Sequence, residues 1–432
     1  MDAAEQFKYG SLGRLPGLPY ELFRVLPMVF PEHLPRPGGW EVFGLIDEGR
    51  GYPIGFARQT VGIDSLVMNC ALCHTATWRS NQTDSAHLVL GAPSGTLNFD
   101  AFVTFLIAAA KDPRFSADVL MKAIAANTNL PPLEASKYRH AVIPVFKYAL
   151  REIAPAKLAW RDERPPTGCG RTDAFNLLKI NILGLRDDGS IGTSDVLPIW
   201  NQHARVGMAF HWNASGTDHH TENLISTFSV NLGPLAFLPE AYQRQTNFTW
   251  NLCPPKFPFA IDVRLAKEGK GVFRSQCARC HAADGRATGR IIPQYITGTD
   301  EKFLALWTDT FRERLDGQKG DPYAFDGLRP SNGFKAVLLD GCWMRASYLH
   351  NGSVPTLTDL LEPRERRPKL FYRGYDVYDP VRVGFVSTGA EARRVGTSYD
   401  TGLPGNSNAG HEWGTDLPAP DKRALVEYLK TL

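Results

Sequence analysis

The chain has 432 residues with 48 Lys and Arg against 45 Asp and Glu, which gives a formal net charge of +3. This length corresponds to two or three ordinary domains, and 43% hydrophobic with 22% charged residues is typical of a globular protein with a sizeable core. The small charge and the short, interrupted basic run at 364–367 argue against a nucleic-acid partner. The longest apolar run, 102–110, is far shorter than the roughly 20 residues that cross a bilayer, so we expect no integral membrane segment.

Proline and glycine divide the chain into parts. They are dense in the first stretch, which predicts an extended N-terminal arm over residues 1–58 that wraps the body of the protein. Three prolines in 247–258 predict a linker. We therefore expect a first unit at 59–246 and a second unit at 259–432.

The motif C-x-x-C-H occurs once in each unit. Its members are Cys70, Cys73 and His74 in the first unit and Cys277, Cys280 and His281 in the second. In this motif two thiols add to the vinyl groups of haem, and the following His ligates the iron from the same side. A zinc site would need a second C-x-x-C pair, which neither unit contains. The sequence thus predicts two covalently bound haem c groups.

Helical apolar spacing predicts helices at 96–110, 117–126, 176–185, 222–229, 263–273 and 421–432. The helix at 263–273 runs directly into Cys277, and Asp421 begins the last helix after Pro420. A first helix before C-x-x-C-H and a last helix packed on it is the arrangement of a class I cytochrome c domain. Strand-like alternation is rare, so we expect a mainly α fold of two such haem domains with extensive loops.

The sixth iron ligand decides between an electron carrier and a reactive haem. For the second haem Met ligation is poorly supported, because Met344 is the last Met of the chain. His411 lies in a loop just before the last helix and is the better candidate. For the first haem His87, 13 residues past His74, is a candidate distal ligand, although an ordinary surface or core position suits it better. The other histidines of the first unit are weaker candidates: His140, His211, His219 and His220.

Seven cysteines are present, and the two motifs use four. Cys169, Cys253 and Cys342 remain, which permits one disulfide and one free thiol without indicating the pairing. The residues after Met1 lack the features of a signal peptide. Because haem is attached to this motif outside the cytoplasm, we expect a leader to have been removed and the protein to be periplasmic or secreted.

Six motifs follow one another along the chain from Gly51 on. They are Asn-Cys-Ala-Leu-Cys-His at 69–74, Gly-Arg-Thr-Asp-Ala-Phe-Asn at 170–176, Ile-Trp-Asn at 199–201, His-Trp-Asn at 211–213, Tyr-Leu-His-Asn-Gly-Ser-Val-Pro-Thr-Leu at 348–357 and Gly-His-Glu-Trp-Gly at 410–414. This order resembles that of the di-haem cytochrome c peroxidase superfamily. It looks closest to the rubber-oxygenase branch, which also includes di-haem fatty-acid dioxygenases.

The resemblance implies different roles for the two haems. In that branch the N-terminal haem is catalytic, and its distal side is lined by a Phe that matches Phe175, with Ala174 beside it. Trp160 resembles an aromatic residue near that haem, and Ala109 and Ala110 resemble small residues of its pocket. The C-terminal haem of the branch has two His ligands and handles electrons, which fits His281 with His411, while His350 matches a histidine near the haem in ordinary peroxidases. This chain is shorter than rubber oxygenases, which puts rubber itself in doubt as the substrate.

These residues predict a di-haem oxidoreductase that activates O2 at the His74 haem to oxidise or cleave an unsaturated, small or long-chain apolar substrate. Phe175 would keep the distal side dry, where charge separation is costly. No His or Glu stands out there to break a peroxide bond, which favours O2 over H2O2. Trp160 would stack on substrate or carry a radical, unless it only packs. A redox protein is an expected electron donor.

Two other functions remain open. A di-haem peroxidase would need an acid–base residue at the distal side, for which His87 and Glu163 are candidates. A plain electron-transfer cytochrome would need a sixth ligand for the first haem. Related peroxidases also bind calcium between their domains, which makes calcium a candidate cofactor here, although the sequence indicates no ligand set.

Overall fold

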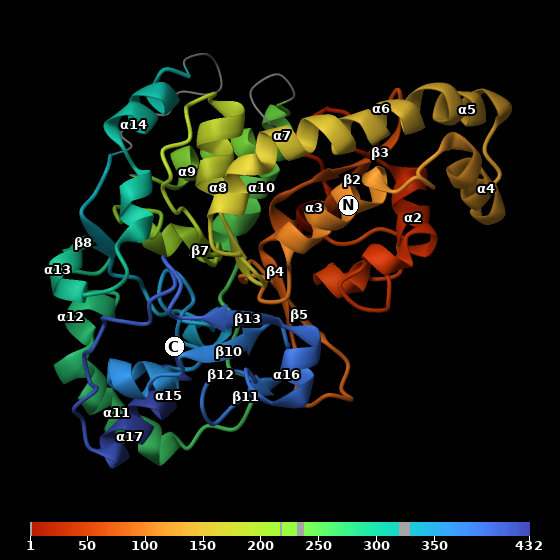
Figure 1. The fold of residues 1–432 in the computed structure, drawn as a ribbon. Coiled ribbons are helices and arrows are strands. Elements are labelled where there is room, and N and C mark those ends of the chain that lie inside the picture. Colours follow the sequence, from red (N-terminus) through yellow and green to blue (C-terminus); the bar gives the residue numbers. More distant parts are fainter. Residues whose placement is uncertain (1, 217, 231–236, 319–328) are drawn as a thin grey trace.

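The computed structural model describes residues 2–216, 218–230, 237–318 and 329–432 (Figure 1). The fold is largely helical, as predicted, and its α-helices are α1 (Ala3–Tyr9), α2 (Tyr20–Val29), α3 (Phe99–Lys111), α4 (Ala117–Asn127), α5 (Pro132–Lys137), α6 (Ile143–Tyr148), α7 (Ala154–Leu158), α8 (Ala174–Asn176), α9 (His219–Val230), α10 (Pro239–Asn251), α11 (Val263–Gln276), α12 (Ala278–His281), α13 (Gln294–Thr297), α14 (Asp309–Asp316), α15 (Leu357–Leu360), α16 (Gly389–Val395) and α17 (Ala419–Leu429).

The strands are short and pair in antiparallel fashion. One sheet has the order β1-β3-β2, and the others are the pairs β4-β5, β6-β7, β8-β9, β10-β13 and β11-β12. Their bounds are β1 (Leu18–Pro19), β2 (Phe56–Val61), β3 (Ile63–Met68), β4 (Thr75–Trp78), β5 (His87–Leu90), β6 (Arg171–Thr172), β7 (Ser194–Asp195), β8 (Ile291–Pro293), β9 (Gly333–Lys335), β10 (Leu370–Arg373), β11 (Tyr378–Asp379), β12 (Gly384–Phe385) and β13 (Thr397–Asp400). The first C-x-x-C-H motif therefore follows the β2–β3 hairpin, whereas a class I cytochrome c domain places a helix there.

Residues 1–58 differ from the extended arm that we expected, because they contain helices α1 and α2. Helix α2 packs into one core with α3 and α4. Its Pro27 cannot donate a hydrogen bond to the carbonyl of Phe23, and the indole Nε1 of Trp40 donates to that carbonyl instead, at 2.9 Å. Trp40 also stacks on the ring of Phe23 at 4.3 Å between centroids. The N-terminal segment is thus an integral part of the first core.

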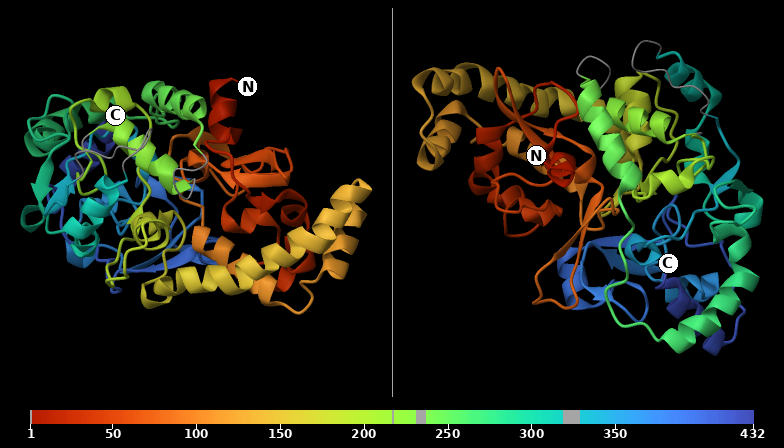
Figure 2. Two further views of the ribbon diagram at one scale, coloured as in Figure 1. Left: turned by 90° about the horizontal axis from the view of Figure 1, so that it is seen from above. Right: turned by 180° about the vertical axis from the view of Figure 1, so that it is seen from behind.

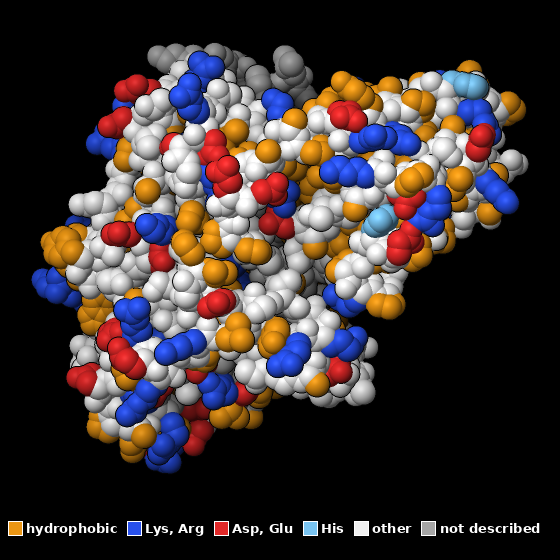
Figure 3. Space-filling model, in the orientation of Figure 1, with side chains coloured by type: hydrophobic (Ala, Val, Ile, Leu, Met, Phe, Trp, Pro, Cys, Tyr) orange, Lys and Arg blue, Asp and Glu red, His pale blue; other side chains and the backbone are white. Residues whose placement is uncertain are grey.

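Helices α4 to α7 project from one end of the molecule (Figures 1 and 2). Two π-helical turns, Tyr138–Val142 and Ala149–Ile153, join α5, α6 and α7. Basic and hydrophobic side chains are both visible on the outside of this projection (Figure 3). Within the described ranges, no helix has both the length and the apolar character to cross a membrane.

The second motif follows directly on helix α11, which packs closely against α17. Gly269 of α11 lies so close to α17 that a Cβ there would come 1.8 Å from the carbonyl oxygen of Ala424. Near the other end of the contact, the rings of Phe273 and Tyr428 lie 5.0 Å apart. Both helices agree with the sequence prediction, and their crossing supports Cys277 at the end of α11.

Gly269→Ala should destabilise the protein, because the added methyl group must push the two helices apart. We expect a loss of roughly 1–3 kcal/mol, the usual range for overpacking. Gly271→Ala in the same helix is the matched control, since a Cβ at Gly271 meets no atom within 4 Å. This control should gain about 0.5–1 kcal/mol from helix propensity. Thermal unfolding followed by circular dichroism measures both, and equal melting temperatures would contradict the close crossing.

Candidate haem sites

The second motif opens onto a pocket of about 1550 Å³, a volume that includes its open, solvent-filled mouth; Cys277, Cys280, His281 and His411 line it together, and it is called the second cavity below. Helix α12 carries His281, whose ring Nδ1 donates a hydrogen bond to the carbonyl oxygen of Val337 at 2.7 Å. This bond fixes the tautomer and leaves Nε2 free to ligate a metal. Burial lowers the pKa of His281, so the ring is in the neutral form that binds metals.

His411 faces His281 across this cavity, with 6.0 Å between the ring centroids. Two metal–imidazole bonds of about 2 Å in line would place the ring centroids roughly 6 Å apart. Burial lowers the pKa of His411 to about 3, which again favours the neutral ring. The residues present therefore fit an iron held between two histidines.

The loop before α17 is fixed by buried hydrogen bonds. The guanidinium Nη1 of Arg367 donates to the carbonyls of Asn408 and Gly410, each at 2.7 Å. Gly410 has a φ of 79°, and a Cβ there would lie 2.3 Å from the backbone of Gly298. His411 itself donates its backbone N–H to Thr297 at 2.7 Å. These hydrogen bonds thus hold the loop in the position that places His411 opposite His281.

The first motif lies on a tight turn that Asn69 caps. The Asn69 side chain accepts from the N–H of Ala71 at 2.9 Å and donates to the carbonyl of Gly10 at 3.0 Å. Burial lowers the pKa of His74 to about 4, and the nearby backbone of Leu197 opposes this shift. Nδ1 of His74 is buried and does not reach hydrogen-bonding geometry with any described residue. Leu197 therefore lies near His74 much as Val337 lies near His281.

Cys73, His74, Ala174 and Phe175 line a separate pocket beside the first motif, called the first cavity below, of about 1290 Å³ including its open, solvent-filled mouth. Phe175 is half-buried in α8, and its ring meets the rings of His211 and Trp307 at 4.9 and 5.0 Å. Among the described residues no histidine ring faces His74 as His411 faces His281. The structure thus brings together the predicted ligand His74 and the predicted distal residues Phe175 and Ala174.

His87 and Met208 are two further side chains to consider as a sixth iron ligand at the first motif. His87 is exposed on β5 and stacks on Trp78 at 4.2 Å, outside the cavity lining. Met208, which the sequence did not single out, does line the cavity and packs directly against Gly289. Met208 is therefore the thioether to test if the first haem proves six-coordinate.

The ring Nε2 of His211 and the carboxylate of Glu222 are in contact in the wall of the same cavity. Their side chains are only 13% and 10% exposed, and the carboxylate Oε1 of Glu222 is buried without a hydrogen-bond partner. The cavity lining therefore contains a His and a Glu, although no such residue stood out on the distal side from the sequence. The His-Trp-Asn motif at 211–213 was visible in the sequence, but nothing there placed it beside Phe175. Glu163, the carboxylate suggested from the sequence, is exposed and absent from the lining.

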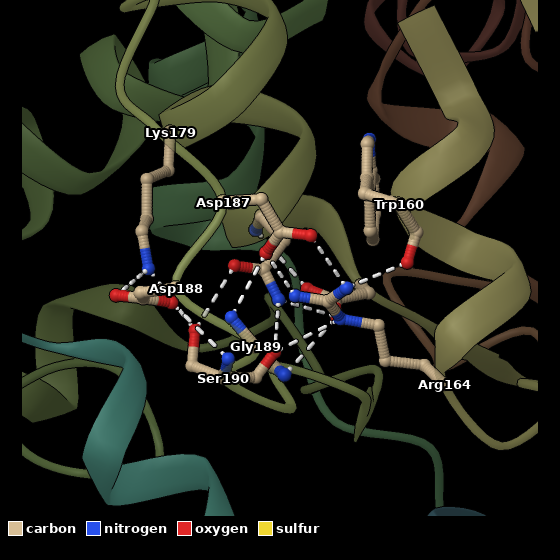
Figure 4. Close-up of polar contacts among 10 residues, drawn as sticks. Trp160, Arg164, Lys179, Asp187, Asp188, Gly189 and Ser190 are labelled. Carbon is tan, nitrogen blue, oxygen red and sulfur yellow. Dashed lines mark hydrogen bonds and ion pairs between the residues drawn. The ribbon is translucent and has the colours of Figure 1, made fainter.

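Trp160 is buried but is not among the described residues that line either cavity. Its carbonyl accepts a hydrogen bond from Arg164 at 2.6 Å, and Arg164 also pairs with Asp187. Figure 4 shows Trp160 beside this pair, next to a polar network that includes Lys179, Asp188 and Ser190. Ala109 and Ala110 are buried in the core that α2 and α3 share. The roles that the resemblance implies for these three residues stay predictions.

The remaining sequence candidates lie as follows. His350 lines the second cavity and stacks on Phe334 at 4.2 Å. Cys169 and Cys342 are buried, Cys253 is exposed, and none of the three is in a disulfide.

The structure offers less support for the weaker histidine candidates as ligands and for a calcium site. His140 is exposed, while His219 packs against Trp250 with tilted rings and His220 contacts Tyr242. Within the described ranges one group has metal-ligand spacing, Glu32, His33 and Asp112, and Arg114 already pairs with both of its carboxylates. Calcium therefore still lacks a convincing ligand set.

The two cavities share one wall. The residues that line both are Asp195, Val196, Leu197, Pro198, Trp212, Lys335, Ala336, Val337 and Arg345. The two candidate haem sites are thus neighbours, separated by a few side chains.

Comparison with known proteins agrees with part of this assignment. Residues 333–372 match a family model described as RoxA-like, cytochrome c-like. The matched segment supplies Lys335, Val337, Arg345 and His350 to the cavity walls. It supports haem c binding, although it does not include either C-x-x-C-H motif.

Two uncharacterized proteins of Sinorhizobium fredii are similar over longer stretches. The protein y4iJ is 31% identical over 258 residues, which are 44% of this chain and 42% of that protein. The protein y4iM is 30% identical over 292 residues, 55% of this chain and 64% of that protein. The alignments thus span less than two thirds of either relative. The match at 333–372 supports a relation between this chain and the RoxA-like cytochromes c. Together with the two cavities, it supports a haem oxidoreductase.

Proposed function

We propose that the protein is a periplasmic or secreted di-haem oxidoreductase in which the two haems do different work. The observation that carries this proposal is the asymmetry of the two cavities. His281 has a histidine partner at coordination distance, whereas His74 faces a cavity lined by Phe175. The second site is then suited to electron handling and the first to binding an oxidant.

Haem iron supplies the activation of oxygen when it is bound, and the protein supplies position and polarity. His74 holds one side of the first site, and Ala174 and Phe175 form part of a largely apolar lining for the oxidant and the substrate. We propose O2 as the oxidant and an unsaturated apolar molecule as the substrate, in line with the RoxA-like match. A redox protein would reduce the second haem.

Incubation with squalene and with oleic acid under 18O2 tests this activity. Mass spectrometry should find 18O in oxidised or cleaved products. Products without 18O, or products that form only when H2O2 is added, would rule out the oxygenase.

A peroxidase is the second candidate function, and the His211–Glu222 pair favours it. A histidine beside a buried carboxylate can hold a proton and pass it to a bound oxidant, which is the general acid–base role that peroxide cleavage needs. Rapid consumption of H2O2 with a reduced cytochrome as donor would select this function over the oxygenase.

A further inference from the structure

The wall between the two cavities carries more positive charge than its own carboxylates balance. Arg205, Lys335 and Arg345 all line the first cavity, and Lys335 and Arg345 also line the second. Asp340 pairs with Arg205 at 2.7 Å and with Arg345 at 2.6 Å. Its other carboxylate oxygen accepts from Asn201 at 2.7 Å. Asp340 is therefore fully engaged by these partners.

Among the described residues, no carboxylate forms an ion pair with Lys335. Its ammonium group lies 5.4 Å from the centroid of the Phe210 ring. Of the carboxylates that line the cavities with it, Asp195 pairs with Arg373 at 2.7 Å, and Glu222 contacts His211 through one oxygen while its other oxygen lies buried without a hydrogen-bond partner. Desolvation, together with Arg205 and Arg345, lowers the pKa of Lys335 to about 7, while Glu222 opposes this shift. An enclosed cation of this kind requires an anion to stay charged.

Arg345 is a second cation in this wall that requires a further hydrogen-bond acceptor. Its Nε is buried without a hydrogen-bond partner, although its two terminal nitrogens bond to Asp340 and to the carbonyl of Leu338. Strand β9 fixes Lys335 between the cavities, because the Lys335 N–H donates to the carbonyl of Trp212 at 2.7 Å. Two residues further on, the carbonyl of Val337 holds His281. The unsatisfied donors therefore belong to the rigid wall that both sites share.

We propose that Lys335, assisted by Arg345, binds propionate carboxylates of both haems and couples the two groups electrostatically. Each haem carries two propionates, so the two cofactors bring the anions that this wall lacks. A cation beside both haems favours electron uptake at each of them, because reduction adds one negative charge. This inference rests on the haem binding in the proposed function and not on the reaction with O2.

A spectroelectrochemical titration of the haem-loaded protein tests the proposal. In Lys335→Met both midpoint potentials should fall by an amount equal to about a tenfold change in the reduction equilibrium, ~59 mV for one electron. Lys335→Arg keeps the charge and should stay close to the parent protein. Lys267→Met removes an exposed lysine of α11 and is the matched control, which should shift neither potential.

Three results would overturn the proposal. They are unchanged potentials in Lys335→Met, a change at one haem only, and a change seen only after a free carboxylate such as octanoate is added. The last result would mean that the wall binds a diffusible anion. If Lys335→Met does not take up haem, Lys335→Gln serves in its place. If the protein shows these shifts but no oxygenase activity, the proposed reaction with O2 is wrong and the role of Lys335 still holds.

Discussion

Replacement of His411 by Ala should convert the second haem from a closed site to an open one. The parent protein should bind CO at the His74 haem only, whereas His411→Ala should bind CO at both haems. The physical reason is that His411 lies 6.0 Å from His281 between ring centroids and leaves no coordination position free once iron lies between them. Absorption spectra and CO titration of the reduced protein measure this change, and the signals of the His74 haem should not move.

His87→Ala is the matched control for this variant. His87 is the strongest candidate from the sequence for a distal ligand of the first haem, and it is exposed on β5. Its loss should leave both haem spectra unchanged. If His411→Ala also leaves them unchanged, the assignment of the second ligand is wrong.

Replacement of His211 by Phe should slow any reaction with H2O2 by about 10²- to 10⁴-fold, the usual contribution of a positioned acid–base group. Glu222→Gln should act in the same direction, because the amide keeps the shape of the side chain but cannot serve as the base. CO binding should be unaffected in both variants, since neither residue is expected to ligate iron. Stopped-flow absorption measures the two rates separately.

Glu163→Gln is the control for the acid–base pair, because Glu163 is exposed and outside the cavity lining. Equal rates for His211→Phe, Glu163→Gln and the parent protein would show that the His211–Glu222 pair only packs. A loss of CO binding in His211→Phe would instead indicate that the replacement blocks the site.

The sequence predicted the parts of this molecule that depend on local pattern. The two C-x-x-C-H motifs and helices α3, α4, α9, α11 and α17 all follow from spacing within a few residues of one another. Helix α2 was missed because the prolines and glycines around it suggested an extended chain. The hydrogen bond that replaces the one Pro27 cannot donate runs from the Trp40 indole to the Phe23 carbonyl, and it joins residues 17 positions apart.

For the same reason, local sequence pattern could not predict which side chains meet in the cavity of the first motif. Phe175 and His211 are 36 positions apart and meet only in the folded chain. The carbonyl of Val337 and the ring of His281 are likewise 56 positions apart. His411 was a candidate from its place in the loop before the last helix, and the resemblance to a known family strengthened this prediction, because position in the sequence alone does not place it opposite His281.

The most direct test of the central claim is CO binding by the purified, reduced, haem-loaded protein, together with electron paramagnetic resonance of its oxidised form. The account predicts one haem that binds CO and one low-spin haem with two histidine ligands that does not. Two low-spin haems that both ignore CO would contradict it, and the protein would then be a plain electron-transfer cytochrome.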